Sequence, residues 1–387
     1  MEERLNKTDT DPDCTARKDQ SKLRLPLFPF ILFGISALAL IALLISIASE
    51  PFANFFNRYI SSVFRGVLAT VSGIIPISLA ELFIITLPVT MFFFIRYAMN
   101  KFGQSWRDVG IFCVCALSIF TTVFSTFVFS FGIGYHTSKL EDRLEFDSVE
   151  VNAQSLAATA DVLIEKINAI ANEVNFAQRG ASVSPYSLSD TTGIILSSYN
   201  RISDEYSFIP RLNSRVKPII LSAPLTYTHI AGVYTYITGE SNINMNCPDY
   251  TLPYTVAHEL AHQRGIARED EANFIAFLVC SGADDQYIRY CGYLNLCEYV
   301  LGALYATDQK LWEKTYKQLD PRVIYEMIAY NEFYEPYMDH IAGDISGAIN
   351  DAYLQANGTE GTVSYGLVVE LAVAYFTKTE KIEYTAY

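Results

Sequence analysis

Charged residues are scarce in this chain: Asp, Glu, Lys and Arg make up 18 % of its 387 residues, whereas 51 % are hydrophobic. That balance excludes an intrinsically disordered protein and argues against an entirely soluble one. Residues 132–387 are strongly acidic, since they hold 17 Lys and Arg against 33 Asp and Glu. Because so acidic a region repels polyphosphate, we expect no nucleic-acid partner.

Three stretches have almost no charge. Residues 27–48 have none, and at about 1.5 Å per residue they are long enough to cross a hydrocarbon core of about 30 Å. Two further stretches, 67–95 and 109–133, contain a single charged residue, Glu81. The sequence therefore predicts a transmembrane region, residues 25–134, with three helices at about 27–48, 74–95 and 109–133. A cleaved secretory signal is the alternative for the first helix, but its apolar run exceeds the roughly 7–15 residues of such signals.

The basic residues near the span ends predict the orientation. Four basic residues lie shortly before the first span: Arg17, Lys18, Lys22 and Arg24. Three lie between the second and third spans: Arg96, Lys101 and Arg107. The connection between the first and second spans has two, Arg58 and Arg65. The positive-inside rule then places the N-terminal tail (1–24) in the cytoplasm. We expect a multi-pass protein of the cell membrane, in contact with the lipid bilayer, with residues 135–387 outside.

Glu81 has two interpretations. An ionisable group at membrane depth is costly and often functional. The other interpretation, which we favour, starts the second span nearer Ile77, so that Glu81 lies close to the headgroups.

The outer region begins with an amphipathic helix, because Leu156, Leu163, Ile167, Ile170 and Val174 share one helical face, which predicts core packing. Residues 179–218 have a loop-like composition, with one short strand predicted at 193–196. Residues 219–244 favour two short strands or a hairpin, and the chain after Pro253 is predicted to be mainly helical.

Seven cysteines are an ordinary count for this length. We place Cys14 in the cytoplasm and Cys113 and Cys115 in the third span. Four remain outside, Cys247, Cys280, Cys291 and Cys297; they allow three pairings, and free buried thiols are the alternative.

The segment Thr255–Gly265 contains the pattern His-Glu-x-x-His. His258 and His262 are four residues apart, so on a helix both imidazoles project from one face and can share a metal ion. Glu259 is placed to reach a water molecule on that metal, as the general base of zinc peptidases does. Pro253 and Gly265 suit the two ends of this helix. The alternative is a pair of surface histidines, which the apolar neighbours of the motif disfavour.

A second predicted helix supplies the third metal ligand. Glu271 shares its face with Ile275 and Leu278, and a carboxylate on a buried face needs a positive partner, for which a metal is the obvious choice. Glu269 and Asp270 are more typical of charges at a helix start, so Glu271 is preferred and Glu269 is the alternative. Two His and one Glu leave a fourth position for water, as in catalytic zinc sites. Ligand types alone leave manganese or cobalt possible in place of Zn²⁺.

These motifs carry a family resemblance. The segment HELAHQRGIAREDEANFIAFLVC, with TGESNIN at 238–244 and YLQANGTEGTVSYG at 353–366, resembles a bacterial family of membrane-anchored domains of unknown function that are regarded as zinc metallopeptidases. EDEAN followed by Phe-Ile-Ala is also similar to the second metal-binding helix of the ImmA/IrrE-like gluzincins, in which the second Glu binds zinc; that implies Glu271. A metzincin is disfavoured, because Arg268 stands at the third-ligand position of that group.

The predicted fold class is mainly α: a three-helix transmembrane region followed by an α+β zincin-like (gluzincin) domain with a small sheet. The expected activity is zinc-dependent hydrolysis of a peptide or protein substrate at the outer membrane face. Tyr365 is the first choice of donor to the tetrahedral oxyanion and His229 the second. Residues 233–244 are expected to form an edge strand that holds extended substrate. Glu240 is interpreted either as a site carboxylate or as a turn residue.

Two other functions remain open: a non-catalytic sensor or scaffold stabilised by metal, and a zinc amidase acting on cell-wall material. The sequence gives neither the substrate nor the oligomeric state.

Overall fold

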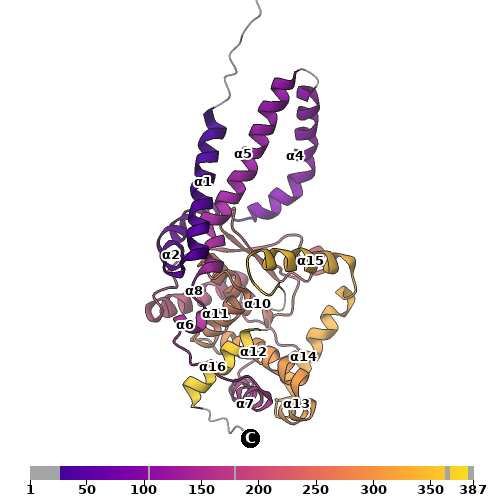
Figure 1. Cartoon of the computed structure of the whole chain (residues 1–387). Helices are drawn as coiled ribbons and strands as arrows, with labels where there is room; N and C mark the ends of the chain where they lie inside the picture. The colour runs from indigo at the N-terminus through magenta and orange to yellow at the C-terminus, as the bar shows by residue number, and fades with distance from the viewer. Residues whose placement is uncertain (1–26, 103–104, 178–179, 362–366, 382–387) are drawn as a thin grey trace, which may run out of the picture.

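The computed structural model describes residues 27–102, 105–177, 180–361 and 367–381, and they are mainly helical (Figure 1). The predicted cytoplasmic tail, with Cys14, and the proposed oxyanion donor Tyr365 lie outside the described residues.

Three helices are long and apolar enough to cross a membrane: α1 (Leu27–Ala48), α4 (Leu79–Phe102) and α5 (Trp106–Ser130). The first has the predicted bounds, the second begins five residues later than predicted, and the third is shifted by three residues. Helices α1 and α5 pack together, and the Ser36 hydroxyl hydrogen-bonds that of Ser125 at 2.8 Å. The N-terminal ends of α1 and α5 and the C-terminal end of α4 lie at the end of this region farthest from the C-terminal region (Figure 1).

The connection from α1 to α4 is itself folded. It consists of α2 (Glu50–Phe55), a π-helix (Phe56–Ser61) and α3 (Ser62–Gly73). Ser49 caps α2, since its hydroxyl accepts a hydrogen bond from the Phe52 amide. Although this segment precedes the second span, it packs against the C-terminal region.

Glu81 lies in the first turn of α4, which agrees with the interpretation that places it at the end of the span. Its carboxylate accepts hydrogen bonds from the backbone amides of Ile220 (2.9 Å) and Leu221 (2.7 Å). Glu81 thus holds a loop of the C-terminal region against the base of α4.

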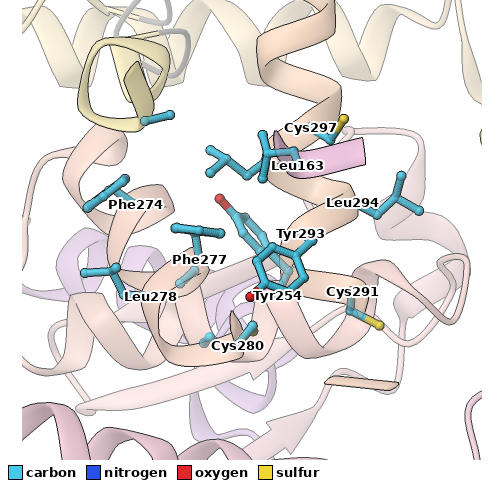
Figure 2. Packing of buried hydrophobic residues seen from close by; sticks show 14 of the residues in the cluster. Leu163, Tyr254, Phe274, Phe277, Leu278, Cys280, Cys291, Tyr293, Leu294 and Cys297 are labelled. Atoms are coloured by element: carbon cyan, nitrogen blue, oxygen red, sulfur yellow. The ribbon is translucent and has the colours of Figure 1, made fainter. Parts of the chain in front are cut away.

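The C-terminal region is built around one apolar core. Its central helices are α7 (Ala153–Ile170), α10 (Thr251–Gln263), α11 (Glu269–Ser281) and α12 (Gln286–Thr307). Figure 2 shows part of this core, where Phe277 and Tyr293 lie near Leu163. The amphipathic helix predicted from Leu156 onward is therefore confirmed as α7, although it ends at Ile170, so Val174 lies beyond it. Further helices surround the core: α6 (Leu140–Arg143), α8 (Leu188–Glu205), α9 (Ser222–Thr226), α13 (Gln309–Tyr316), α14 (Pro321–Tyr334), α15 (Ile341–Ala356), α16 (Val368–Glu380) and the 3₁₀ segments Gly132–His136 and Glu335–Tyr337.

Helix α8 contradicts the loop-and-strand prediction for residues 179–218, so the strand predicted at 193–196 is wrong. Ser187 begins this helix with a capping box in which Asp190 returns the hydrogen bond. Ile195, Tyr199 and Ile202 follow at helical spacing and are buried. Capping and one apolar stripe therefore outweigh a composition rich in Ser, Asn and Gly.

A sheet of three short strands lies beside the helices. Its order is β1 (Val216–Pro218), β3 (Glu240–Ile243), β2 (Gly232–Thr235), with β1 parallel and β2 antiparallel to β3. The predicted hairpin is thus confirmed as β2 and β3, whereas 222–226 is helical. Residues 233–244 were expected to form one edge strand. They contribute to two strands, of which β2 lies at the edge of the sheet and β3 lies in the centre.

The described cysteines are all free thiols, including Cys247, Cys280, Cys291 and Cys297. The last three are buried in the core (Figure 2), so the free-thiol alternative holds.

Candidate metal centre

Helix α10 carries the two motif histidines on one face. Pro253 lies in its first turn, and Gly265, just past its end, has φ of +93°, a conformation that favours glycine. The Nε2 atoms of His258 and His262 lie 3.0 Å apart. The one-turn spacing therefore aims both rings at one point, as the motif predicts.

The third side chain at this point is Glu269, the first residue of α11. Its Oε2 lies 3.2 Å from His258 Nε2 and 3.4 Å from His262 Nε2. The three side chains are only 8–13 % exposed. Among the described residues, these three side chains lie close enough to one another to hold one metal ion.

A backbone contact fixes which nitrogen of His262 is available. Its Nδ1 lies 2.7 Å from the carbonyl oxygen of Ile266. Because a carbonyl only accepts, Nδ1 carries the hydrogen in the neutral ring, and the lone pair of that ring is on Nε2, which faces His258 and Glu269. Histidine ligands of metals are commonly oriented in this way.

The electrostatics of the cluster favour a positive charge. Burial by itself would lower the pKa of His262, but the adjacent Glu269 carboxylate raises it to about 9. Burial would raise the pKa of Glu269, but the two imidazoles outweigh burial and hold it well below its usual range. A proton or a divalent cation satisfies this arrangement.

Glu271, the preferred third ligand from the sequence, lies elsewhere. Its Oε2 is 2.7 Å from Arg143, and its Oε1 accepts hydrogen bonds from Arg268 (2.8 Å) and from the Leu140 amide (3.0 Å). The buried carboxylate does have positive partners, as expected, but they are two arginines. The structure therefore replaces Glu271 by Glu269 at the pair of histidines.

Glu259 is buried beside the cluster. It lies against the edge strand β2, so closely that a Cβ atom added to Gly232 would be 2.6 Å from its Oε1. The backbone of Tyr234 hydrogen-bonds this carboxylate, and among the described residues its Oε2 has no hydrogen-bond partner. Burial raises the pKa of Glu259, although the two histidines act against that shift.

Two further predicted residues have other partners. His229 lies in a hollow of about 640 Å³ next to α14, and its Nε2 is 3.0 Å from the carbonyl oxygen of Tyr337. Glu240 is buried in an ion pair with Lys217 and accepts hydrogen bonds from the amides of Leu79 and Ala80 at the start of α4. Glu240 is thus neither a site carboxylate nor a plain turn residue, since it anchors α4 to the sheet.

Sequence reasoning missed an aromatic group at the site. It comprises Phe127, Tyr135, Tyr236 and Tyr353, which we call the aromatic rim. Tyr353 of α15 hydrogen-bonds Tyr135 at 3.3 Å between hydroxyls. Burial raises the pKa of Tyr353 to about 12, and the charge of Glu269 adds to the shift. The ring of Tyr135 packs on that of Phe131, which packs on His262, so the rim borders the cluster. The sequence signal for Tyr353 was that it begins the YLQANGTEGTVSYG segment, one of the segments that carry the family resemblance.

Comparison with curated proteins and with solved structures finds no match for this chain. Residues 54–373 match the family described as "Protein of unknown function (DUF3810)", a span that includes α4, α5, the sheet and all three side chains of the His258, His262 and Glu269 cluster. The chain therefore belongs to the DUF3810 family.

Proposed function

We propose that this protein is a membrane-anchored zinc metallopeptidase of gluzincin type. The observation that carries the proposal is the convergence of His258, His262 and Glu269 on one point, with the buried Glu259 carboxylate beside it. A metal that only stabilised the fold would gain nothing from that carboxylate, and a closed site would fill its fourth position with a protein ligand.

The donor set fits zinc. In a tetrahedron with bonds of about 2.0–2.1 Å, the ligand atoms are about 3.3 Å apart. The three separations here are 3.0, 3.2 and 3.4 Å. Two neutral imidazoles and one carboxylate match the ligands of catalytic zinc peptidases.

The chemistry divides between the metal and Glu259. Zinc held by these side chains would polarise a peptide carbonyl and lower the pKa of water to about 7. Glu259 would take the proton of the attacking water and deliver it to the leaving amine. Its raised pKa suits both steps, because a general base works best with a pKa near the operating pH. Strand β2 would pair with extended substrate beside this carboxylate.

The proposal includes a three-span arrangement with the N-terminus in the cytoplasm. The connection from α1 to α4 packs with the C-terminal region, whereas Arg96 and Arg107 lie toward the far ends of α4 and α5 (Figure 1). This distribution supports an extracytoplasmic catalytic region under the positive-inside rule.

The test is metal analysis and peptide cleavage by the purified full-length protein, with Glu259→Gln as the variant. We expect about one zinc per chain in both forms and loss of cleavage in the variant. The exposed Glu165 of α7 provides the matched control, Glu165→Gln. Cleavage that survives Glu259→Gln would refute the mechanism. If that variant is harmless while His258→Ala unfolds the protein, the metal only holds the fold.

A further inference from the structure

The metal-binding helix is joined directly to the end of the third span. Helix α5 ends at Ser130, and the ring of Phe131 packs on His262 at 5.7 Å between centroids. The buried Arg65 guanidinium donates to the carbonyl oxygens of Ser130 (2.9 Å) and Arg264 (3.2 Å). One side chain thus connects the end of α5 to the end of α10.

The aromatic rim extends this connection to the site itself. Phe127, in the last turn of α5, packs on Tyr236 at 5.2 Å and on Tyr353 at 6.3 Å between ring centroids. The Ser130 hydroxyl donates to the Tyr236 carbonyl oxygen at 3.3 Å. A residue of the apolar helix α5 therefore contacts Tyr353 of α15, the tyrosine that hydrogen-bonds Tyr135.

Bilayer dimensions then limit the depth of the site. Helix α5 has 25 residues, about 37 Å at 1.5 Å each, which exceeds a hydrocarbon core of about 30 Å. Its last turn accordingly reaches the headgroup layer, which is about 5–8 Å thick on each side. Because Phe131 follows at once and contacts His262, the metal-binding cluster lies within about one headgroup layer of the hydrocarbon.

Helix α15 has the surface expected at this depth. Ile341, Ile345 and Ile349 are 69 %, 55 % and 66 % exposed and follow one another at intervals of four, so they form one bare apolar stripe. The helix runs across Figure 1 below the lower ends of α4 and α5. Asp344 on the same helix is exposed but lies about 100° around the helix from the centre of this stripe, so we expect α15 to rest among the headgroups with its apolar stripe toward the hydrocarbon.

We infer that the substrate is a membrane-anchored polypeptide that is cut a few residues from the point where it leaves the bilayer. The inference rests on the proposed peptidase function. An extended chain rises about 3.3 Å per residue, so about two residues cross a layer of about 5–8 Å, and the scissile bond lies only a few residues beyond the hydrocarbon boundary. Anchoring in the same bilayer raises the effective concentration of such a substrate, whereas a soluble peptide lacks that advantage.

The experiment places the full-length protein in phosphatidylcholine vesicles with one cleavable sequence in four forms. Three forms are joined to a transmembrane helix by spacers of about 4, 12 and 30 residues, and the fourth is free in solution. We expect the shortest spacer to be cut at least about tenfold faster than the longest spacer and the free peptide. Equal rates for all four forms would overturn this inference and leave the peptidase proposal standing. Failure to cut any form by the zinc-loaded protein would overturn the peptidase proposal and this inference with it.

A second measurement does not depend on activity. Brominated lipids should quench the added fluorescence of Ile345→Trp more strongly than that of Tyr305→Trp, each measured against the parent protein. Tyr305, at the C-terminal part of α12, is 49 % exposed and so provides a matched position away from α15. Equal quenching at the two positions would contradict the placement of α15 on the bilayer.

Discussion

Gly232→Ala tests the position of the proposed general base with a single methyl group. The added Cβ would lie 2.6 Å from Glu259 Oε1, 2.7 Å from Cγ and 2.9 Å from Cδ. Ordinary contacts between such atoms are about 3.5–4.0 Å, so the carboxylate must retreat by about 1 Å. The substitution suits a strand and leaves the histidines and Glu269 untouched.

The structure predicts a selective loss of activity from this change. A displacement of about 1 Å in a catalytic group can reduce the rate by about 10²-fold, which corresponds to about 2.7 kcal/mol. Zinc content should stay at the parent value because none of the three proposed ligands moves. The assay is kcat/KM for a peptide, together with metal analysis and thermal unfolding of the same preparation.

Gly193→Ala is the matched control. A Cβ at Gly193, in the interior of α8, meets nothing within 4 Å. This control should keep full activity and gain up to about 1 kcal/mol of stability, because alanine favours a helix. If Gly232→Ala cleaves as fast as the control while both bind zinc, the assignment of Glu259 as the base beside β2 is refuted.

Three further predictions concern single side chains. Glu269→Gln should weaken zinc binding at least about tenfold. Glu271→Gln should keep the zinc and lower the Tm, because Arg143 and Arg268 lose the negative charge that they pair with. If instead Glu271→Gln loses the zinc and Glu269→Gln keeps it, Glu271 is the ligand. Burial raises the pKa of Glu298 in α12 to about 8, against about 4.3 in an unfolded chain. The folded state therefore binds the proton more tightly than the unfolded state does, so the free energy of unfolding declines as the pH rises from about 4.3 to about 8. Glu298→Gln should therefore stabilise the protein by about 1–2 kcal/mol at pH 8 and not near pH 4, and equal gains in thermal unfolding at both pH values would contradict this reasoning. Arg65→Met should lower the free energy of unfolding by about 3 kcal/mol or more, because four oxygen atoms lose the donor of their hydrogen bond. A decrease below about 1 kcal/mol in denaturant titration would show that Arg65 does not hold the end of α5 to the end of α10.

The helix that carries the motif could be predicted from the sequence because its signals are local. Pro253 and Gly265 mark its ends, and the spacing of His258 and His262 fixes their common face. The same holds for the three long apolar helices and for the β2–β3 hairpin. Each depends on a pattern that is complete within one short segment of the chain.

The third side chain of the cluster was harder, because it depends on contacts between segments distant in sequence. Glu271 is on the buried face of α11, as the periodicity indicates, but its charge is met by Arg143, 128 residues away. Glu269 reads as an ordinary charge at a helix start until α11 is placed against α10. No pattern within the segment reveals which of the two carboxylates faces the histidines.

Helix α8 shows a different limit. Its apolar residues are few and separated by Ser, Thr and Asn, so the composition suggests a loop although the spacing of Ile195, Tyr199 and Ile202 is helical. The capping box that begins it at Ser187 was also visible in the sequence. Periodicity and capping were the better guides here, because burial follows the stripe and not the average polarity.

Two buried charges of the C-terminal region, Lys217 and Glu240, also hydrogen-bond backbone groups of the N-terminal part, and these contacts help to hold the site in place. Lys217 donates to the carbonyl oxygens of Ser72 and Ile77, and Glu240 accepts from the first amides of α4. Each such hydrogen bond to a charged group contributes about 1.5–3 kcal/mol, and together they are a large share of a typical folding free energy. The long apolar helices and the region that follows them are therefore one structural unit, so the distance from these helices to His258 and His262 is set by packing and not by the length of a linker.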